Sequence, residues 1–394
     1  MTPLFRKILG MNWVLILTMY GLLVFGVFSI ESAARHIPIG NLEPDQWGLW
    51  FADRQKLWII LGSIVYFGAA LIDYRWLKWL GIPMYVIGIS MLLVLLGKGS
   101  EEHQLTVAGI TFQPTQLVIA AGIIMIGLTF EALPRVHKMY AHPIAKLALI
   151  GGLCGVPFLL VVKNGDMGSA IVWLPVAVVA MLVGGIPFRY LLFLTQIAVG
   201  LLAIVYFLAL PIVSERGARR IDNYLENLER GYIVDTDENY AEYRVTMAVG
   251  KAGWKGVGYS STAKNSLHHR KDIPWMTAHN DYIFAVIAEE QGFRGSLLLI
   301  TGFALLLIQC LFIAFYSRDF SGQLIASGVV ALLFAHIFEN IGMCVSIMPI
   351  TGIPLPLISY SGTFVLICMF LLGVVQSIWV HRNTERRGGE VRLD

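Results

Sequence analysis

Long apolar runs separated by short polar connections make up most of the chain. A helix needs roughly 20 mostly apolar residues to cross a bilayer, and ten runs of about that length can be recognised. They lie near residues 12–30, 57–72, 79–97, 115–132, 143–162, 169–186, 191–213, 294–316, 323–348 and 363–380. The pattern predicts an all-α polytopic membrane protein, and an even number of spans places both termini on one side.

Basic residues gather in the connections on the side of the termini. About a dozen Lys and Arg residues fall there, Arg6, Lys7, Arg75 and Lys78 among them, against about five in the short connections opposite. Because an excess of Lys and Arg marks the cytoplasmic side of a span, both termini are predicted to be cytoplasmic.

Composition agrees with a membrane protein and excludes other classes. Hydrophobic residues make up 57% of the 394 residues and charged residues 14%, whereas soluble chains carry about 25% charged residues. The net charge of only +3 and the lack of a basic block beside aromatic residues exclude nucleic-acid binding. Four cysteines lie in apolar runs without paired spacing, so neither disulfides nor a zinc site is predicted.

One connection, residues 214–281, is far longer than the others and carries about 20 charged residues. It follows the seventh predicted span and therefore faces outward. Long loops in compact domains are usually functional or disordered. The tyrosines and the stretch Gly250, Gly253, Gly256 and Gly258 favour a loop folded against the bundle, with a solvated linker as the alternative.

A short outer connection before the sixth span carries Lys163 and Asp166, with glycines that permit a tight turn. A carboxylate there could cap the following helix, because it would accept the free N–H groups of the first turn. Alternatively, Asp166 and Lys163 face an outer cavity shared with the long loop.

The densest group of chemically active side chains lies at residues 274–290. Asp281 is predicted in the first turn of a helix with Glu289 two turns below it, and His279 beside Asp281 resembles a general-base pair. The alternative is an ordinary N-cap at Asn280 or Asp281. Upstream, residues 268–271 concentrate cationic donors that could cradle a pyrophosphate or simply be solvated.

A proline-rich stretch at residues 349–363 is too apolar for a free loop and cannot form a continuous helix. Irregular backbone at membrane depth is tolerated only inside protein or beside a wet cavity, so the stretch is predicted to line the outer cavity. Just before it, His336, Glu339 and Asn340 interrupt the ninth span, and two of them should point inward, for which interhelical hydrogen bonding is the simpler explanation.

Taken in order, these motifs resemble those of the SEDS family of cell-wall glycosyltransferases, whose members include RodA, FtsW and SpoVE. Matching elements run through most of the chain, and no single one is decisive. They are Asp53-Arg54-Gln55, Ile72-Asp73-Tyr74-Arg75, Phe112-Gln113-Pro114-Thr115, Asn164-Gly165-Asp166-Met167-Gly168-Ser169, His279-Asn280-Asp281-Tyr282-Ile283-Phe284-Ala285 with Glu289-Glu290, Asn340-Ile341-Gly342-Met343 and residues 349–362. The form of residues 349–356 is more similar to RodA members than to FtsW members.

The resemblance implies polymerisation of lipid II into a growing glycan strand at the outer face of the bacterial cytoplasmic membrane during cell elongation. It also implies an elongation complex with a class B penicillin-binding protein as the transpeptidase. Asp281 matches the position of the family's catalytic carboxylate, which would act as the base. The candidate substrate-binding residues are Asp166, Lys163, Arg219, Arg220, Arg270, Lys271, His279 and Ser359. No covalently bound cofactor is expected, and a divalent cation, Mg²⁺ or Mn²⁺, remains open without assigned ligands.

Two departures lie at the fourth span, where Gln116 and Ile119 replace the family's Glu and Lys. Losing both charges together suggests a compensated replacement, because one buried charge left alone would be costly. Three alternatives stay open: a lipid II flippase, an FtsW-like division paralogue and a catalytically idle scaffold. The acids Asp166 and Asp281 favour an enzyme, since a flippase needs charged groups along a path through the bilayer.

Overall fold

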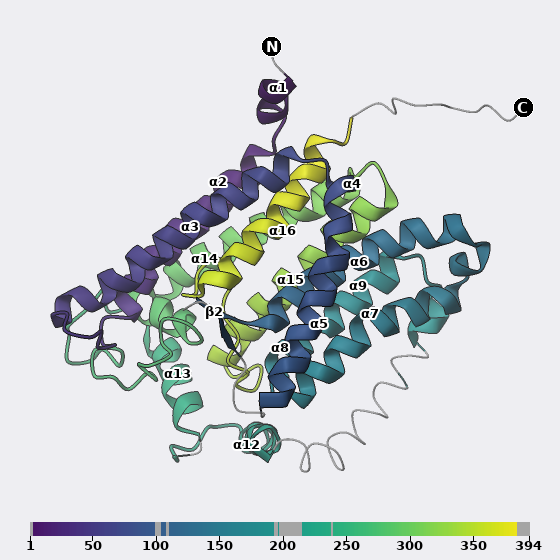
Figure 1. The fold of residues 1–394 in the computed structure, drawn as a ribbon. Coiled ribbons are helices and arrows are strands. Elements are labelled where there is room, and N and C mark those ends of the chain that lie inside the picture. The colour runs from purple at the N-terminus through teal and green to yellow at the C-terminus, as the bar shows by residue number, and fades with distance from the viewer. Residues whose placement is uncertain are drawn as a thin grey trace, which may run out of the picture.

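The protein folds into a bundle of long helices, described by a computed structural model over residues 3–98, 104–107, 110–192, 196, 215–237 and 239–383 (Figure 1). The first half contains α1 (Pro3–Leu9), α2 (Trp13–Ala33), η1 (Pro44–Gln46), α3 (Trp47–Leu71), α4 (Tyr74–Leu77), η2 (Lys78–Leu80), α5 (Gly81–Lys98), β1 (Leu105–Val107), β2 (Ile110–Phe112) and α6 (Pro114–Val136). The rest contains η3 (Lys138–Ala141), α7 (Pro143–Lys163), α8 (Met167–Ile171), α9 (Trp173–Val183), α12 (Glu215–Arg230), α13 (Tyr240–Lys251), α14 (Ile283–Phe315), α15 (Phe320–Cys344) and α16 (Gly362–Val380).

The predicted fold class is confirmed, with differences in detail. Among the described residues, seven helical segments are long and apolar enough to cross a membrane: α2, α4 to α5, α6, α7, α14, α15 and α16. The predicted span at 57–72 belongs to α3, which begins ten residues earlier at Trp47, and that at 169–186 is the shorter apolar segment Met167–Val183. Most of the predicted span near 191–213 lies outside the described residues.

Two local features were not predicted. β1 and β2 form an antiparallel hairpin, with Leu105 opposite Phe112, just before α6. The helix α14 begins at Ile283, close to the helix start predicted at Asp281, and runs on through the span predicted from residue 294, but its interruption at Gly292, whose φ of 68° and ψ of −163° are not helical, was not predicted. The second part of α14 therefore corresponds to the predicted span, and the first part carries the family-like acidic pair into the bundle.

The ends of the helices are set by residues that satisfy free backbone N–H groups. Asn12 accepts a hydrogen bond from the N–H of Leu15 at the start of α2, and Asp319 accepts one from Gly322 at 2.7 Å at the start of α15. Pro114 and Pro143 occupy the first turns of α6 and α7, where proline loses no hydrogen bond.

The core lies around α15 and α16. In both of these spans 72% of the apolar window is buried, against 22% for α7 and for the α4 to α5 segment. The long contact between α16 and α3 relies on small residues: a side chain at Gly62 would collide with Met369, and one at Gly373 would lie 2.6 Å from the Tyr66 carbonyl oxygen. Small residues permit such close helix packing in membranes.

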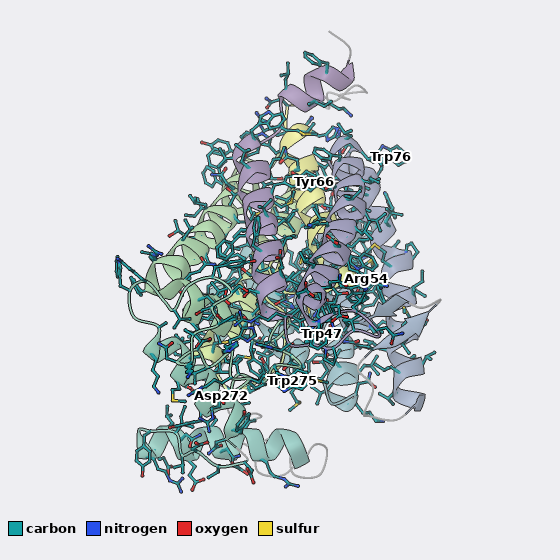
Figure 2. All side chains as sticks on the ribbon, turned by 90° about the vertical axis from the view of Figure 1, so that its left-hand side faces the viewer. Trp47, Arg54, Tyr66, Trp76, Asp272 and Trp275 are labelled. Carbon is teal, nitrogen blue, oxygen red and sulfur yellow. The ribbon has the colours of Figure 1, made fainter. Side chains whose placement is uncertain are left out.

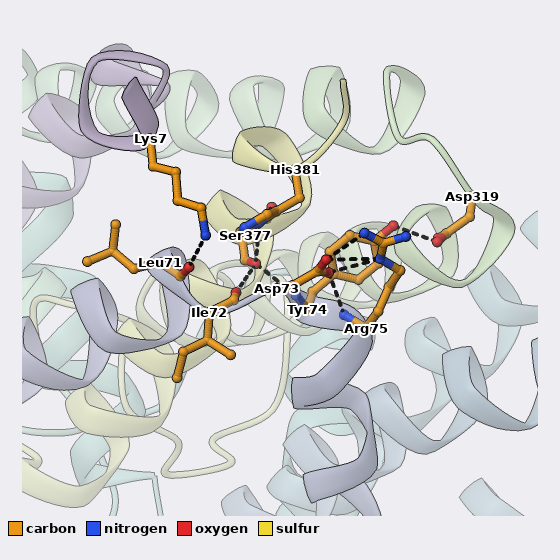
Figure 3. Close-up of polar contacts among 9 residues, drawn as sticks. All are labelled: Lys7, Leu71, Ile72, Asp73, Tyr74, Arg75, Asp319, Ser377 and His381. Atoms are coloured by element: carbon orange, nitrogen blue, oxygen red, sulfur yellow. Dashed lines mark hydrogen bonds and ion pairs between the residues drawn. The ribbon is translucent and has the colours of Figure 1, made fainter. Parts of the chain in front are cut away.

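Polar contacts tie several helices together where α1 and the end of α16 lie (Figure 3). The Tyr74 hydroxyl donates to Asp319 Oδ2 at 2.6 Å, and the Tyr74 N–H donates to Ser377 Oγ at 2.9 Å. Lys7 donates to the Leu71 carbonyl oxygen at 3.0 Å. The helices α12 and α13 lie toward the opposite end (Figure 1), so the long connection and the two ends of the described chain are on different sides of the bundle.

Candidate active site

Asp281 lies in a turn that precedes α14, so the prediction that it occupies the helix's first turn is wrong. The helix begins at Ile283, and the Asp281 N–H donates to the Thr277 carbonyl oxygen at 2.9 Å. Its own carbonyl oxygen accepts from Asn340 Nδ2 at 2.9 Å, and the same amide group donates to the Ile353 carbonyl oxygen at 2.7 Å. Asn340 therefore joins the Asp281 turn to the proline-rich segment.

Ser359 makes a second contact between the proline-rich segment and the Asp281 turn. Its hydroxyl donates to the Asn280 carbonyl oxygen at 2.6 Å and accepts from the Leu355 N–H at 2.8 Å. The Tyr360 N–H donates to the His279 carbonyl oxygen at 3.0 Å. The proline-rich segment is thus irregular and largely buried backbone, as the sequence predicted, and it packs against the Asp281 turn, which was not predicted. Ser359 is a buried residue that joins the two.

The segment Thr351–Ile353 lies between the two acids that the sequence singled out. Gly352, at φ 74°, would bring a Cβ atom to 3.6 Å from Asp281 Oδ2. On the other side, a Cβ at Gly168 would lie 3.0 Å from the Thr351 carbonyl oxygen. Gly168 follows Asp166 in the turn that opens α8, so both carboxyl groups border this one stretch of backbone.

Asp166 is the N-cap of α8, which bears out the capping interpretation. Its Oδ1 accepts from the Ser169 N–H at 3.1 Å, and its Oδ2 accepts from Gln113 Nε2 at 3.1 Å. Capping uses one oxygen of the carboxylate and Gln113 orients the other. Gln113 comes directly before α6 and was noted only as part of a family-like motif.

Glu339 is a third acid in this region. His336, Glu339 and Asn340 are all buried, one more than the two that the sequence predicted to point inward. The Glu339 carboxyl group lies beside Thr351 and within electrostatic reach of Asp166, but its oxygens form no hydrogen bond of ordinary geometry among the described residues. Gln116, which stands where the family has a Glu, is likewise buried, and its amide has no hydrogen-bond partner in the described part of the chain.

The His279 ring packs against two aromatic side chains. Its Nδ1 does not form the general-base pair that the sequence suggested. Its ring lies 4.8 Å from the ring of Phe51 and 5.4 Å from that of Tyr360, between centroids. Burial lowers the pKa of His279 to about 4, and Nδ1 has no hydrogen-bond partner among the described residues. His279 is therefore neutral near pH 7.

Arg54 is a cation that the sequence analysis did not propose for the site. It lies near the start of α3, with its guanidinium carbon 4.3 Å from the centroid of Trp50. Burial raises the pKa of Tyr360, and the charge of Arg54 acts in the opposite direction, so the two groups are neighbours. In the sequence, the family-like motif Asp53-Arg54-Gln55 was the feature that could have pointed to Arg54 as a site residue.

The predicted cationic residues lie on the loop side of the bundle. Arg270 pairs with Asp272 at 2.6 Å, and the Lys271 ammonium lies 5.4 Å from the Trp275 ring centroid. Figure 2 shows Asp272 and Trp275 at the end of the bundle nearer α12, below Arg54 and Trp47. Lys163, at the end of α7, is exposed, as is Arg219 on α12, whereas the side chain of Arg220 lies outside the described part.

The acidic pair of α14 anchors the long loop instead of facing Asp281. The Glu289 carboxylate accepts from the N–H groups of Leu267 and His268, the latter at 2.9 Å, and Glu290 accepts from the Ser32 hydroxyl. His268 is fully buried, with Nε2 donating to the Ser32 carbonyl oxygen at 3.0 Å. Burial lowers the pKa of His268 to about 3.

The glycine stretch of the loop packs directly on the kink of α14. The N–H groups of Val257 and Gly258 donate to the carbonyl oxygens of Glu289 and Glu290, both at 2.9 Å. The backbones approach so closely that a Cβ at Gly256 would lie 2.4 Å from the Glu290 carbonyl oxygen. The prediction that this stretch folds against the bundle is confirmed.

The fold and the site together define a polytopic membrane protein whose carboxyl groups border a buried, irregular segment on the side of its long loop. The FtsW/RodA/SpoVE family, described as cell cycle proteins, matches residues 12–384. The chain belongs to this family.

Similar proteins extend over nearly the whole chain. A probable peptidoglycan glycosyltransferase FtsW from a Geobacter species is 26% identical, covering 97% of this chain and 99% of the relative. The peptidoglycan glycosyltransferase MrdB of Escherichia coli is also 26% identical, covering 94% and 93%. Among solved structures, a chain of a peptidoglycan synthase complex has a TM-score of 0.73 at 23% identity, covering 95% and 99%. The rod shape determining protein RodA of Thermus thermophilus has a TM-score of 0.64 at 23% identity, covering 95% and 98%.

Proposed function

We propose that this protein is a peptidoglycan glycosyltransferase that polymerises lipid II at the outer face of the bacterial cytoplasmic membrane. The observation that carries the proposal is the position of Asp281. Asn340 holds its backbone, and its carboxylate lies beside Gly352, which has no side chain to fill the space. Membership of a family whose relatives bear this activity in their names supports it.

In the proposed reaction Asp281 is the general base. A sugar 4-hydroxyl of one substrate loses its proton to the carboxylate as its oxygen attacks the anomeric carbon of the other. The bond from that carbon to the pyrophosphate breaks, and undecaprenyl pyrophosphate leaves with the electron pair. The Asp281 turn needs a fixed backbone for this task, because a small misplacement of a catalytic group is costly in rate.

Negative charge grows on the departing pyrophosphate and needs cationic donors. Arg54, Arg270 and Lys271 are the described cations that we assign to this task, with Lys163, Arg219 and Arg220 as further candidates for the substrate. The described residues contain no group of three or more His, Cys, Asp or Glu side chains arranged to hold a metal. A divalent cation would therefore need ligands from the substrate, as Mg²⁺ often does, and no step is assigned to one.

We assign the elongation role, with a class B penicillin-binding protein and other elongation proteins as partners. The RodA-like form of residues 349–356 supports this role, and a chain of a peptidoglycan synthase complex is among the similar structures. A division role would be the FtsW-like alternative. A flippase is disfavoured because Asp166, Glu339 and Asp281 gather around one segment instead of tracing a path through the bilayer.

The test uses the purified full-length chain with its cognate transpeptidase, fluorescent lipid II and a divalent cation. Asp281→Asn keeps the size of the side chain but removes the base, and glycan polymer should fall at least about 100-fold. Asp237→Asn, at an exposed acid of the long connection, is the matched control and should polymerise like wild type. Wild-type protein that moves lipid II across vesicles without making polymer would overturn the proposal in favour of a flippase.

A further inference from the structure

A pocket lies between α12 and α13, and its lining includes none of the carboxyl groups around Thr351–Ile353. Its volume is about 450 Å³, within the range of small-molecule sites. The walls are tyrosines, Tyr224 and Tyr232 from the α12 side and Tyr243 from α13, and Met247 adds an apolar contact. None of these residues belongs to the motifs on which the proposed function rests.

Polar side chains at the pocket are buried and hydrogen-bonded to one another. Glu242 is 7% exposed and its Oε2 accepts a hydrogen bond from Asn227 Nδ2 at 3.2 Å. Asn227 Oδ1 in turn accepts from Asn239 Nδ2 at 3.4 Å, and both amides are more than nine-tenths buried. A buried acid costs free energy unless it has a partner. The hydrogen bonds among these three side chains therefore indicate a preformed binding site.

The pocket is also hydrogen-bonded to the start of the segment that leads to Thr351 and Gly352, beside Asp281. The Tyr224 hydroxyl donates to the Ile347 carbonyl oxygen at 2.7 Å, and the hydroxyls of Thr246 and Ser346 share a hydrogen bond of 2.6 Å. Ser346 has a φ of 56°, rare for a residue other than glycine. Thr351 is five positions further along the chain, which limits the two Cα atoms to about 18 Å apart.

The chemistry of the lining selects one class of ligand. Glu242 is the only charged residue in the described lining. The neighbouring Arg244, whose guanidinium carbon lies 5.4 Å from the Tyr243 ring centroid, is paired with Asp235 at 3.0 Å, so a phosphate or pyrophosphate would meet an acid in the lining and no cation there. A lipid tail would bury Glu242 and Asn227 against hydrocarbon, which is unfavourable. A saccharide has apolar C–H faces that suit aromatic rings, and hydroxyl groups that suit a carboxyl and an amide.

We propose that the pocket between α12 and α13 binds amino-sugar glycan, as a subsite separate from the Asp281 site. The inference rests on the proposed function, because a glycan polymerase must hold a strand beyond the point where the bond forms. The same sugars occur in the growing strand and in the head group of an incoming substrate, and the length of the bound glycan distinguishes these sources.

The experiment measures binding of a β-1,4-linked N-acetylglucosamine tetramer to the full-length protein in nanodiscs by calorimetry. Wild type should bind, Tyr243→Ala should bind about five- to tenfold more weakly because it loses the aromatic face, and Tyr243→Phe should retain affinity. Glu242→Gln should also weaken binding. Tyr140→Ala, in η3, is the matched control for removing a tyrosine outside the pocket and should bind like wild type.

Tighter binding of the tetramer than of the dimer would assign the pocket to the growing strand, and equal binding to the head group. Tetramer affinity unchanged by Tyr243→Ala and Glu242→Gln, or absent in wild type, would overturn the proposal. So would protection of Tyr243 by the transpeptidase partner without any saccharide binding, which would assign the pocket to a protein. Because Asp281→Asn protein should bind the tetramer normally, failure of this subsite and failure of the proposed reaction are separable.

Discussion

The side-chain amide of Asn340, in α15, donates to the backbone carbonyl oxygen of Asp281, in the turn before α14, at 2.9 Å. The same NH₂ group reaches Ile353, so a single side chain fixes the Asp281 turn against the proline-rich segment. Both carbonyl oxygens accept from this one NH₂ group, and a buried carbonyl left without a partner costs about 1–3 kcal/mol.

Asn340→Leu should therefore lower the melting temperature and reduce polymerisation by at least about tenfold, because Asp281 loses its support. Asn12→Leu, which removes a helix cap and a bond to Gln309 near α1, is the control. It should lower the melting temperature while the remaining folded protein keeps its specific activity. Equal specific activities for the two variants would show that Asn340 serves stability alone.

Gly352→Ala should reduce turnover by placing a methyl group 3.6 Å from Asp281 Oδ2 in the space needed by substrate. It also adds about 1 kcal/mol of backbone strain, because φ is 74°. Gly185 has nearly the same φ, 70°, and a methyl group there would meet no atom within 4 Å. Gly185→Ala is therefore the control that shows the effect of backbone strain alone. Initial rates of lipid II polymerisation should fall only in Gly352→Ala, and a similar decrease in both variants would contradict this explanation.

Gly256→Ala should detach the long loop from α14, because its methyl group would lie 2.4 Å from the Glu290 carbonyl oxygen, a backbone atom that cannot move alone. Gly253→Ala shares a positive φ but has no atom within 4 Å. We expect a loss of several degrees in melting temperature and faster proteolysis of the loop for Gly256→Ala only. Indistinguishable proteolysis rates would argue against a rigid contact.

Stability should fall as the pH drops below about 6.5, in part through His268. Burial lowers its pKa from 6.5 to about 3, so between these values the unfolded chain binds the proton and the folded chain does not. Stability rises with pH wherever the unfolded state binds more protons, and this histidine alone contributes roughly 3 kcal/mol of loss at pH 4.

His268→Gln can keep the hydrogen bond to Ser32 while removing the titrating ring. Its melting temperature should depend less on pH between 7 and 4 than that of wild type, measured by scanning fluorimetry. His36 and His279, whose pKa values burial lowers to about 4, supply the pH dependence that remains. An unchanged slope in the variant would show that His268 is protonated in the folded protein.

The sequence predicted the apolar spans, the outward loop and the acids Asp166 and Asp281, because each is marked by local composition or by a motif. It could not predict that Asn340 supports Asp281, since 59 positions separate them. Hydrophobic periodicity reports how deeply a residue is buried, but not which distant backbone atom its side chain meets. For the same reason the sequence placed Glu289 only as two turns below Asp281 and could not predict that its carboxylate binds the backbone of the long loop.

The pairing of α3 with α16 also bears on the order in which the chain is made. A growing chain releases α3 early, yet the helix that covers it, with Met369 against Gly62 and Gly373 against Tyr66, is made only after more than half of the described chain has followed. During synthesis α3 must wait in the membrane with its surface around Gly62 and Tyr66 against lipid or an insertase. A chain truncated before Gly362 would lack this partner altogether and should be cleared by proteolysis.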